Sequence, residues 1–296
     1  MTYLAELLIN GVSLGLVYSL IALGFVVIYK STRVINFAQG STLLLGAYVV
    51  AITYEAIGFF PALALGIVAG GAVAAAIEFL LVRRAKRADP TALSILTIGV
   101  DVLLATDLSR RIGQQILAFG DPWGNASVSL GSIVVPQARI AAMVISAVLV
   151  LAFLLAFKYT TWGVATRATA EDKETASLMG IRLGRISIAA WIIAGCLATV
   201  AGVFLGLAPS PGLTNTSNLM ALAAIPAAVV GGLDSTVGAV VGGLLIGVVQ
   251  SLAAGYNDEL LFLGQPLATV SAYIVMLIVL LWRPSGLFGS KEISRV

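Results

Sequence analysis

The feature that most constrains this sequence is a series of long segments that contain no Asp, Glu, Lys or Arg. The longest of them covers 186–233. Of the 296 residues, 59% are hydrophobic and 10% are charged, whereas a soluble domain carries about 25% charged residues. No soluble fold has an interior large enough for so much apolar side chain. A bilayer admits only helices and closed barrels, and barrel strands alternate apolar and polar residues, so these continuous runs predict helices.

Most of the apolar runs reach the length of about 20 residues that crosses a bilayer. The run 186–233 is long enough for two spans, with a turn marked by Pro209 and Pro211. The segment from Pro90 to about Leu108 is the least conventional span because it contains Asp101. The remaining candidates are 7–29, 34–54, 56–77, 140–157, 235–257 and 260–282.

These runs predict an all-α, polytopic integral membrane protein with eight or nine transmembrane helices, folded as one transmembrane domain over 1–296. Broken or half helices are expected near 34–54, which polar residues interrupt, and near 219–233, which is short and contains Pro226. The run 7–29 follows no basic segment, which favours a retained span over a signal peptide.

The positive charges predict the orientation of these spans. With nine spans and an external N-terminus, all but Arg110, Arg111 and Arg139 of the 17 Lys and Arg residues fall on the cytoplasmic side. The positive-inside rule requires this asymmetry. We therefore expect the N-terminus outside and the C-terminus inside, with an external loop over 109–138 and a strongly charged cytoplasmic loop over 158–185.

Several function classes are disfavoured by what the sequence lacks. There is no histidine, and Cys196 is the single cysteine, so the commonest general base and metal ligand are absent and no disulfide can form within the chain. A membrane enzyme and a metal site are therefore not expected. No Gly-Lys pair of a P-loop occurs, so any ATP hydrolysis must take place on another chain. The net charge of +3 reflects membrane topology and does not predict a nucleic-acid partner.

The cytoplasmic loop contains the signals of a short helix. Thr169 followed by Asp172 resembles a capping box, the acids suit the N-terminal end of a helix, and Gly180 suits the position just after its C-terminus. A helix of about ten residues is expected between two spans. It is either a surface helix that shortens the loop or a docking helix for a soluble partner.

Motifs spread along nearly the whole chain resemble those of one family. Besides the loop with its flanking Gly163, Arg167 and Ile181, they are Asn10–Gly15, Val34–Gly40, Val230–Ser235 and Arg283–Gly289. In this order they resemble the permeases of high-affinity branched-chain amino acid importers of the ATP-binding-cassette class, and among these the smaller of the two permeases that such importers pair.

The resemblance implies a heteromeric importer in a bacterial or archaeal cell membrane. Its partners would be a second, related permease, two ATP-binding-cassette ATPases and an extracytoplasmic substrate-binding protein, besides membrane lipid. ATP and Mg²⁺ would be bound by the ATPases, and this chain would be a non-catalytic subunit that translocates branched-chain or other hydrophobic amino acids. The docking helix would then couple the permease to the ATPase through Arg167, Glu171, Asp172, Ala176 and Gly180.

A polar segment within the run 34–54 is the candidate translocation pathway. Helices broken at membrane depth are tolerated where they line a cavity, and their N-termini favour a carboxylate. The alternative is helix packing, because small polar residues commonly join helices in membranes. Where the family usually has a histidine, this chain has Gln39. The pathway residues so predicted are Asn36, Gln39, Gly40, Ser41, Thr42 and Asp101.

Asp101 is included because an acid without a sequence-near partner in a membrane is by default a functional candidate. Asp107, in contrast, has Arg110 and Arg111 three and four residues further on, a helical pairing distance.

Two other transport functions remain open. One is an ATP-binding-cassette permease for urea or short amides, since the external binding protein does much of the selection. The other is an ATPase-independent secondary transporter or channel, which the scarcity of intramembrane titratable groups disfavours.

Overall fold

The structure is a computed structural model, and it describes residues 2–85, 89–120, 122–124, 126–130, 133–207, 212–257 and 267–289. Pro209 and Pro211, which mark the predicted turn, lie outside the described residues. Within these ranges seven helices are long and apolar enough to cross a membrane. They are α1 (Thr2–Thr32), α2 (Gln39–Ile57), α3 (Phe59–Ile77, continued by the π-helical turn η1 at Glu78–Val82), α4 (Pro90–Ile112), α5 (Gln137–Tyr159), α8 (Leu183–Leu207) and α11 (Thr236–Gly255).

Shorter helices complete the bundle. The apolar helix α12 (Leu267–Trp282) has 16 described residues. The others are α6 (Thr161–Glu171), α7 (Lys173–Leu178), α9 (Asn218–Leu222) and α10 (Ile225–Gly231). The prediction of an all-α polytopic membrane protein is thus confirmed.

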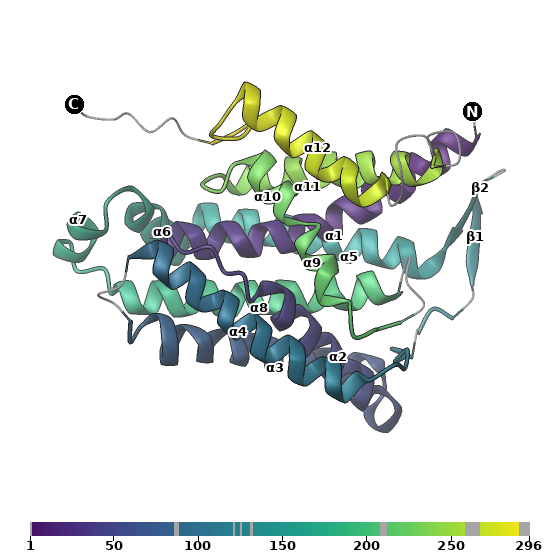
Figure 1. Cartoon of the computed structure of the whole chain (residues 1–296), viewed down its shortest axis with the longest axis horizontal. Helices are drawn as coiled ribbons and strands as arrows, with labels where there is room; N and C mark the ends of the chain where they lie inside the picture. The colour runs from purple at the N-terminus through teal and green to yellow at the C-terminus, as the bar shows by residue number, and fades with distance from the viewer. Residues whose placement is uncertain are drawn as a thin grey trace.

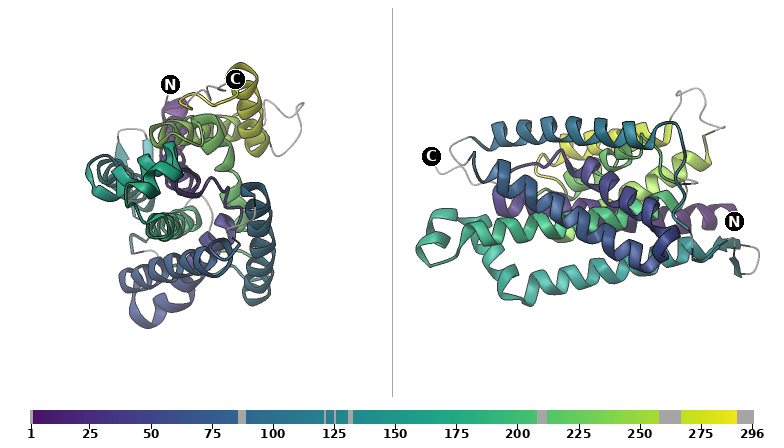
Figure 2. Two further views of the ribbon diagram at one scale, coloured as in Figure 1. Left: turned by 90° about the vertical axis from the view of Figure 1, so that its left-hand side faces the viewer. Right: turned by 90° about the horizontal axis from the view of Figure 1, so that it is seen from below.

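The long helices lie roughly along one axis, and the two predicted loops occupy opposite ends of it (Figure 1). The helices α6 and α7 protrude at one end, and a β-hairpin lies at the other. In cross-section α1 lies between α11 on one side and α8 on the other, and α8 in turn contacts α2 and α3 (Figure 2). This layering places α1 at the centre of the molecule.

Both segments expected to be broken are broken. Residues Val34–Ala38 are not helical, and α2 begins only at Gln39. The segment 219–233 forms α9 and α10, two short helices separated by a turn at Ala223 and Ala224. Pro226 lies in the first turn of α10, where the missing N–H of proline breaks no helical hydrogen bond.

The loop over 109–138 contains structure that the sequence analysis did not predict. Strands β1 (Ser127–Leu130) and β2 (Ile133–Pro136) form an antiparallel hairpin in which Val128 pairs with Val135. The short alternation of valine with other residues favours strands, but four residues are too few to distinguish a strand from irregular loop. The predicted pairing of Asp107 with Arg110 and Arg111 is confirmed, at 3.0 and 2.7 Å.

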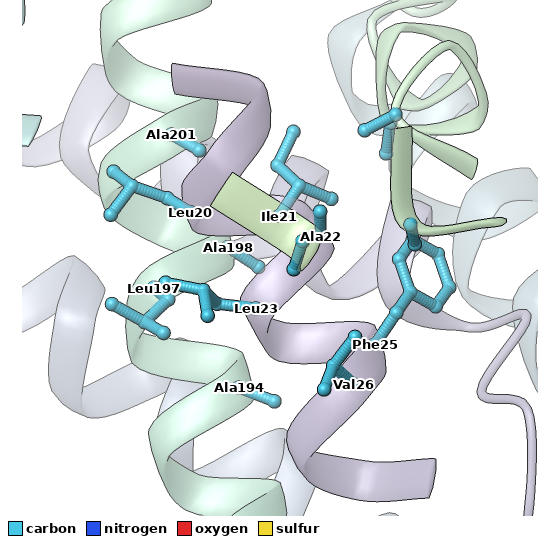
Figure 3. Packing of buried hydrophobic residues seen from close by; sticks show 14 of the residues in the cluster. Leu20, Ile21, Ala22, Leu23, Phe25, Val26, Ala194, Leu197, Ala198 and Ala201 are labelled. Atoms are coloured by element: carbon cyan, nitrogen blue, oxygen red, sulfur yellow. The ribbon is translucent and has the colours of Figure 1, made fainter. Parts of the chain in front are cut away.

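The core is centred on α1 and α8. Leu20, Ile21 and Leu23 of α1 are fully buried, and the small side chains of Ala194 and Ala198 on α8 let the two helices approach (Figure 3). Trp191, also on α8, is the largest fully buried side chain among the described residues. Large residues on one helix thus fill the space left by small residues on the other.

The most extensive helix contact among the described residues joins α1 to α11 through two matching rows of small residues. The two helices run antiparallel. The row Gly11, Gly15 and Ser19 on α1 faces the row Gly243 and Gly247 on α11. A Cβ atom added at Gly247 would overlap the backbone of Gly15, and one added at Gly15 would lie 2.7 Å from the Cα of Leu244. In lipid, such close backbone contact contributes van der Waals attraction that the hydrophobic effect does not supply between helices.

We predict that Gly247→Leu lowers the free energy of unfolding by about 1–3 kcal/mol or more, because the side chain must push α1 away from α11. The measurement is denaturation of the purified protein in detergent. Gly99→Leu is the matched control, since a Cβ atom at Gly99 of α4 meets no atom within 4 Å. Equal stability of the two variants would contradict the prediction.

Candidate functional site

The non-helical segment before α2 is held in place by a row of polar side chains on α4. Ser94 Oγ accepts a hydrogen bond from the backbone N–H of Ile35 at 3.1 Å, and Thr97 Oγ1 accepts one from that of Phe37 at 3.0 Å. These two residues are three positions apart and share one face of α4. The backbone groups that the break in the helix frees are therefore satisfied by α4, as a membrane interior requires.

Asp101 extends the same face of α4 and caps α2. Its Oδ1 accepts a hydrogen bond from the backbone N–H of Ser41 at 3.1 Å. Ser41 is the third residue of α2, so this N–H has no partner within the helix, and the carboxylate also complements the positive end of the helix dipole. Asp101 thus has a partner that no local sequence pattern could reveal. In this structure the N-terminus of α2 is occupied by a carboxylate of the chain itself.

The polar side chains of the segment are buried and paired with one another. Asn36, Gln39, Ser41 and Thr42 are each at most 1% exposed. Asn36 Nδ2 donates to Gln39 Oε1, and Gln39 Nε2 donates to the carbonyl of Ala194, both at 3.1 Å. The hydroxyls of Ser41 and Thr42 donate to a backbone carbonyl one turn earlier. Gly40 is buried among them. The structure thus gathers all six predicted pathway residues around the start of α2, with Ser41 facing Asp101 of α4 and Gln39 bonded to α8.

We predict that Asp101→Leu lowers the free energy of unfolding by about 1–3 kcal/mol, because the Ser41 N–H is left without an acceptor in a partly buried site. Asp101→Asn, which keeps an oxygen at the same position, should cost markedly less. Chemical denaturation of both purified variants measures the difference. Equal losses would show that the negative charge, rather than the acceptor, is what α2 needs.

The predicted coupling segment, 158–185, begins at a tight corner between α5 and α6. Arg167 donates to the carbonyl oxygens of Phe157 and, at 3.2 Å, of Lys158, and its guanidinium lies 5.5 Å from the centre of the Phe157 ring. It therefore satisfies carbonyls at the C-terminal end of α5. Gly163 makes the corner possible, since a Cβ atom there would overlap the backbone of Phe157.

The prediction of one coupling helix of about ten residues is wrong in where the helix starts and in how long it is. Thr169 lies within α6, where it is buried and donates to the carbonyl of Ala165. Glu171 is the last residue of α6 rather than part of a first turn, so the helix dipole gives no reason for an acid there. Asp172 has extended backbone angles that end α6, and it begins a new helix, α7, of 6 residues. Asp172, which the sequence analysis placed at the third position of a capping box begun by Thr169, is itself the N-cap of α7.

Asp172 is well suited to this role. Its carboxylate accepts hydrogen bonds from the backbone N–H groups of Glu174 at 2.8 Å and Thr175 at 3.1 Å. Hydrogen bonds from the backbone and then the hydroxyl of Thr175, followed by that from Glu174, hold the pKa of the Asp172 carboxyl below its ordinary value. The cap is therefore ionised at neutral pH.

The end of α7 is as predicted. Gly180 has a φ of 86°, in the left-handed region that glycine favours after a helix. The N–H of Gly180 donates to the carbonyl of Ser177 at 3.0 Å, and that of Ile181 to the carbonyl of Ala176 at 3.1 Å. These two bonds define a Schellman motif. Ala176 is buried at the base of the turn.

Two long basic side chains tie the coupling segment to the end of α1. Arg33 donates to the carbonyl of Ala170 at 2.7 Å, and Lys173 Nζ donates to the carbonyl of Thr32 at 2.8 Å. Burial, followed by the charge of Arg33, lowers the pKa of the Lys173 ammonium. The α6–α7 unit is thus fixed to the central helix of the bundle at two points.

The sequence analysis missed the two most exposed apolar residues of the coupling segment. Leu178 is 87% exposed and Met179 is 79% exposed, and they lie directly before the turn at Gly180. The available signal was two large apolar residues in an otherwise charged loop. Exposed apolar side chains at the tip of a protruding helix are typical of a protein contact.

Two of the motifs that are far apart in the sequence pack against each other at the same end of the bundle. The backbone N–H groups of Leu287 and Phe288 donate to the carbonyls of Val230 and Gly231, at 2.8 and 3.1 Å. Lys30 of α1 donates to the carbonyl of Asp234, which follows Gly231 in the turn between α10 and α11. A cavity of about 1010 Å³ adjoins this junction. The C-terminal motif is thus part of the framework that holds the α10–α11 turn.

Taken together, the apolar helices, the two breaks within the bundle and the protruding helix pair define a multi-pass membrane protein with the architecture of a transport subunit. Within the described ranges no three His, Cys, Asp or Glu side chains gather as a metal site would require. A family model described as "Branched-chain amino acid transport system / permease component" matches residues 7–281. The chain belongs to this family.

Relatives that match along most of their length come from bacteria and an archaeon. The chain is 30% identical to the high-affinity branched-chain amino acid transport system permease protein LivH of Salmonella typhimurium, and the match covers 99% of this chain and 98% of LivH. It is 30% identical to BraD of Pseudomonas aeruginosa over the same shares. It is 31% identical to a probable LivH of Methanocaldococcus jannaschii, over 94% and 90% of the two chains.

One solved structure has a related fold. It is PsaBC from Streptococcus pneumoniae in complex with Fab, with a TM-score of 0.50 and 16% sequence identity over 94% of this chain and 91% of that chain. At this identity the likeness concerns the fold alone.

Proposed function

We propose that this chain is the membrane-spanning permease subunit of an ATP-binding-cassette importer that translocates branched-chain or other hydrophobic amino acids delivered by an external binding protein. The observation that carries the proposal is the match along almost the whole chain to proteins named as branched-chain amino acid permeases. The importer further requires a second, related permease and two ATPase subunits. ATP and Mg²⁺ are bound by those ATPases, because this chain has no P-loop.

In this proposal the α6–α7 unit transmits the motion of the ATPase. Leu178 and Met179 enter a groove on the ATPase, Asp172 and Gly180 fix the two ends of α7, and Arg167 fixes the corner to α5. The contacts of Arg33 and Lys173 carry the motion to α1. Support for this role comes from the protruding position of α7 and from its fixed attachment to the bundle, since a flexible loop could not transmit force.

The translocation pathway in this proposal runs along the seam of α2 and α4. In the apolar stretch of α4, only 11% of the residues are buried. Much of that helix is therefore free to face a second permease. The side chains of Asn36, Gln39, Ser41 and Thr42 are paired within the chain. Passage of substrate therefore requires that α4 moves and that Asp101 releases the N-terminus of α2.

We predict that the double variant Leu178→Ala, Met179→Ala lowers leucine uptake and substrate-stimulated ATP hydrolysis together by about tenfold or more, because an apolar contact worth a few kcal/mol is removed. The measurement uses the importer reconstituted in liposomes with its ATPases and binding protein. Ile116→Ala is the control, since Ile116 is 57% exposed near the hairpin end. Unchanged uptake and ATP hydrolysis in the double variant would show that α7 is not the docking helix. A wild-type importer that moves no amino acid would refute the proposed function.

We also propose that the hairpin end is extracytoplasmic and that α7 is cytoplasmic, on the basis of the distribution of Lys and Arg. Cysteines placed at Ala126 and at Ser177, both exposed, test this in a Cys196→Ala background. Ala126 is chosen because its neighbour Asn125, in the middle of the predicted external loop, lies outside the described residues. An impermeant thiol reagent should label Ala126→Cys in intact cells, and Ser177→Cys only after permeabilisation. The reverse pattern would invert the topology.

A further inference from the structure

A second cavity lies inside the half of the bundle nearest the hairpin, away from the seam of α2 and α4. It has a volume of about 460 Å³, within the range of small-molecule sites. Its walls come from the first half of α1, the start of α5 and the end of α11, with Leu205 of α8 and Ala268 of α12 completing them. Segments far apart in the sequence thus line one space.

The cavity contains one positive charge. Arg139, near the start of α5, lines it and donates to Asn10 Oδ1 on α1. A guanidinium has five N–H donors, and this bond satisfies one of them. Among the described residues no carboxylate lies within ion-pair distance of Arg139. Arg139 is half-buried, and the charge of Glu6 on α1 acts on it from beyond that distance.

The rest of the lining combines apolar residues with the uncharged polar residues Asn10, Ser13, Tyr18, Gln250 and Ser251. Leu14, Val17 and Ala142 form apolar walls. The buried Tyr18 hydroxyl already donates to Gln250 Oε1 at 2.8 Å. A guanidinium beside apolar walls matches a molecule with a carboxylate head and an aliphatic body.

We propose that this cavity is a binding site for a carboxylate carried on a short aliphatic chain, with the carboxylate on Arg139 and the chain against the walls formed by Leu14, Val17 and Ala142. A carboxylate can accept two parallel hydrogen bonds from a guanidinium, of whose five N–H donors the bond to Asn10 takes one. Two sources provide this chemistry: a hydrophobic amino acid from solution and a fatty acid from the membrane. The proposal stands on the cavity alone and does not require the transport function.

The test measures binding to the assembled importer in lipid nanodiscs, without ATP and without the binding protein. The probes are radiolabelled leucine and radiolabelled decanoate, each with 4-methylpentanoate and isoamylamine as competitors. Arg139→Gln removes the charge, and Ala142→Phe fills the cavity while keeping Arg139. Arg110→Gln, at an arginine whose side chain is 77% exposed, is the control. Size-exclusion chromatography verifies that each variant is assembled.

Saturable binding of either probe supports the proposal if both Arg139→Gln and Ala142→Phe weaken it by about tenfold or more while Arg110→Gln leaves it unchanged. Displacement by 4-methylpentanoate, which keeps the carboxylate, and not by isoamylamine is expected. Binding of leucine alone identifies a solute site, and binding of decanoate alone a lipid site. Absence of binding by both probes, or binding that survives both variants, overturns the proposal. Neither of these results would contradict the proposed transport function, because that function is tested by ATP-driven uptake and not by this binding measurement.

Discussion

The close contact of α1 with α11 is the interaction on which the rest of the structure depends. Because Gly11, Gly15, Gly243 and Gly247 have no side chains, two backbones meet along several turns, and α1 is fixed at the centre of the bundle. Its other face then packs on α8. Its end receives the coupling segment through Thr32 and the following residue, while its first half lines the inner cavity. Stability, the proposed coupling and the proposed binding site therefore rest on the same helix.

A second group of contacts joins the ends of several helices at the α7 end of the molecule. Lys30 reaches the turn between α10 and α11, and the backbone of the C-terminal motif bonds to the end of α10. Arg33, three residues after Lys30, binds the end of α6. In the proposed coupling, a displacement of α6 and α7 would therefore reach α1 and, through Lys30, the α10–α11 turn. The family motifs at Val230–Ser235 and Arg283–Gly289 thus have a structural explanation: they hold the turn between α10 and α11 against the end of α1.

Much of the fold could be predicted from the sequence because bilayer physics leaves few options for long uncharged runs. Both breaks were predictable, since polar residues and Pro226 interrupt otherwise continuous runs. Local capping was only partly predictable. Gly180 behaved as its position indicated, whereas Asp172 took the N-cap role assigned to Thr169, because either residue type caps a helix. The role of Asp101 could not be predicted, as its partner lies 60 positions away in the chain. The exposure of Leu178 and Met179 likewise depends on how α7 is held.

The contact between Asp101 and α2 has a consequence for how this seam can open. The carboxylate neutralises the positive end of a helix inside a medium of low dielectric constant, where separated charges are strongly penalised. Partial separation would leave both groups unpaired, so intermediate positions of α4 are unfavourable. The seam is consequently expected to behave as a two-position device, either closed on Asp101 or fully open with water or another anion at the N-terminus of α2. In the proposed pathway, a substrate carboxylate that reaches this point would compete with the protein's own acid.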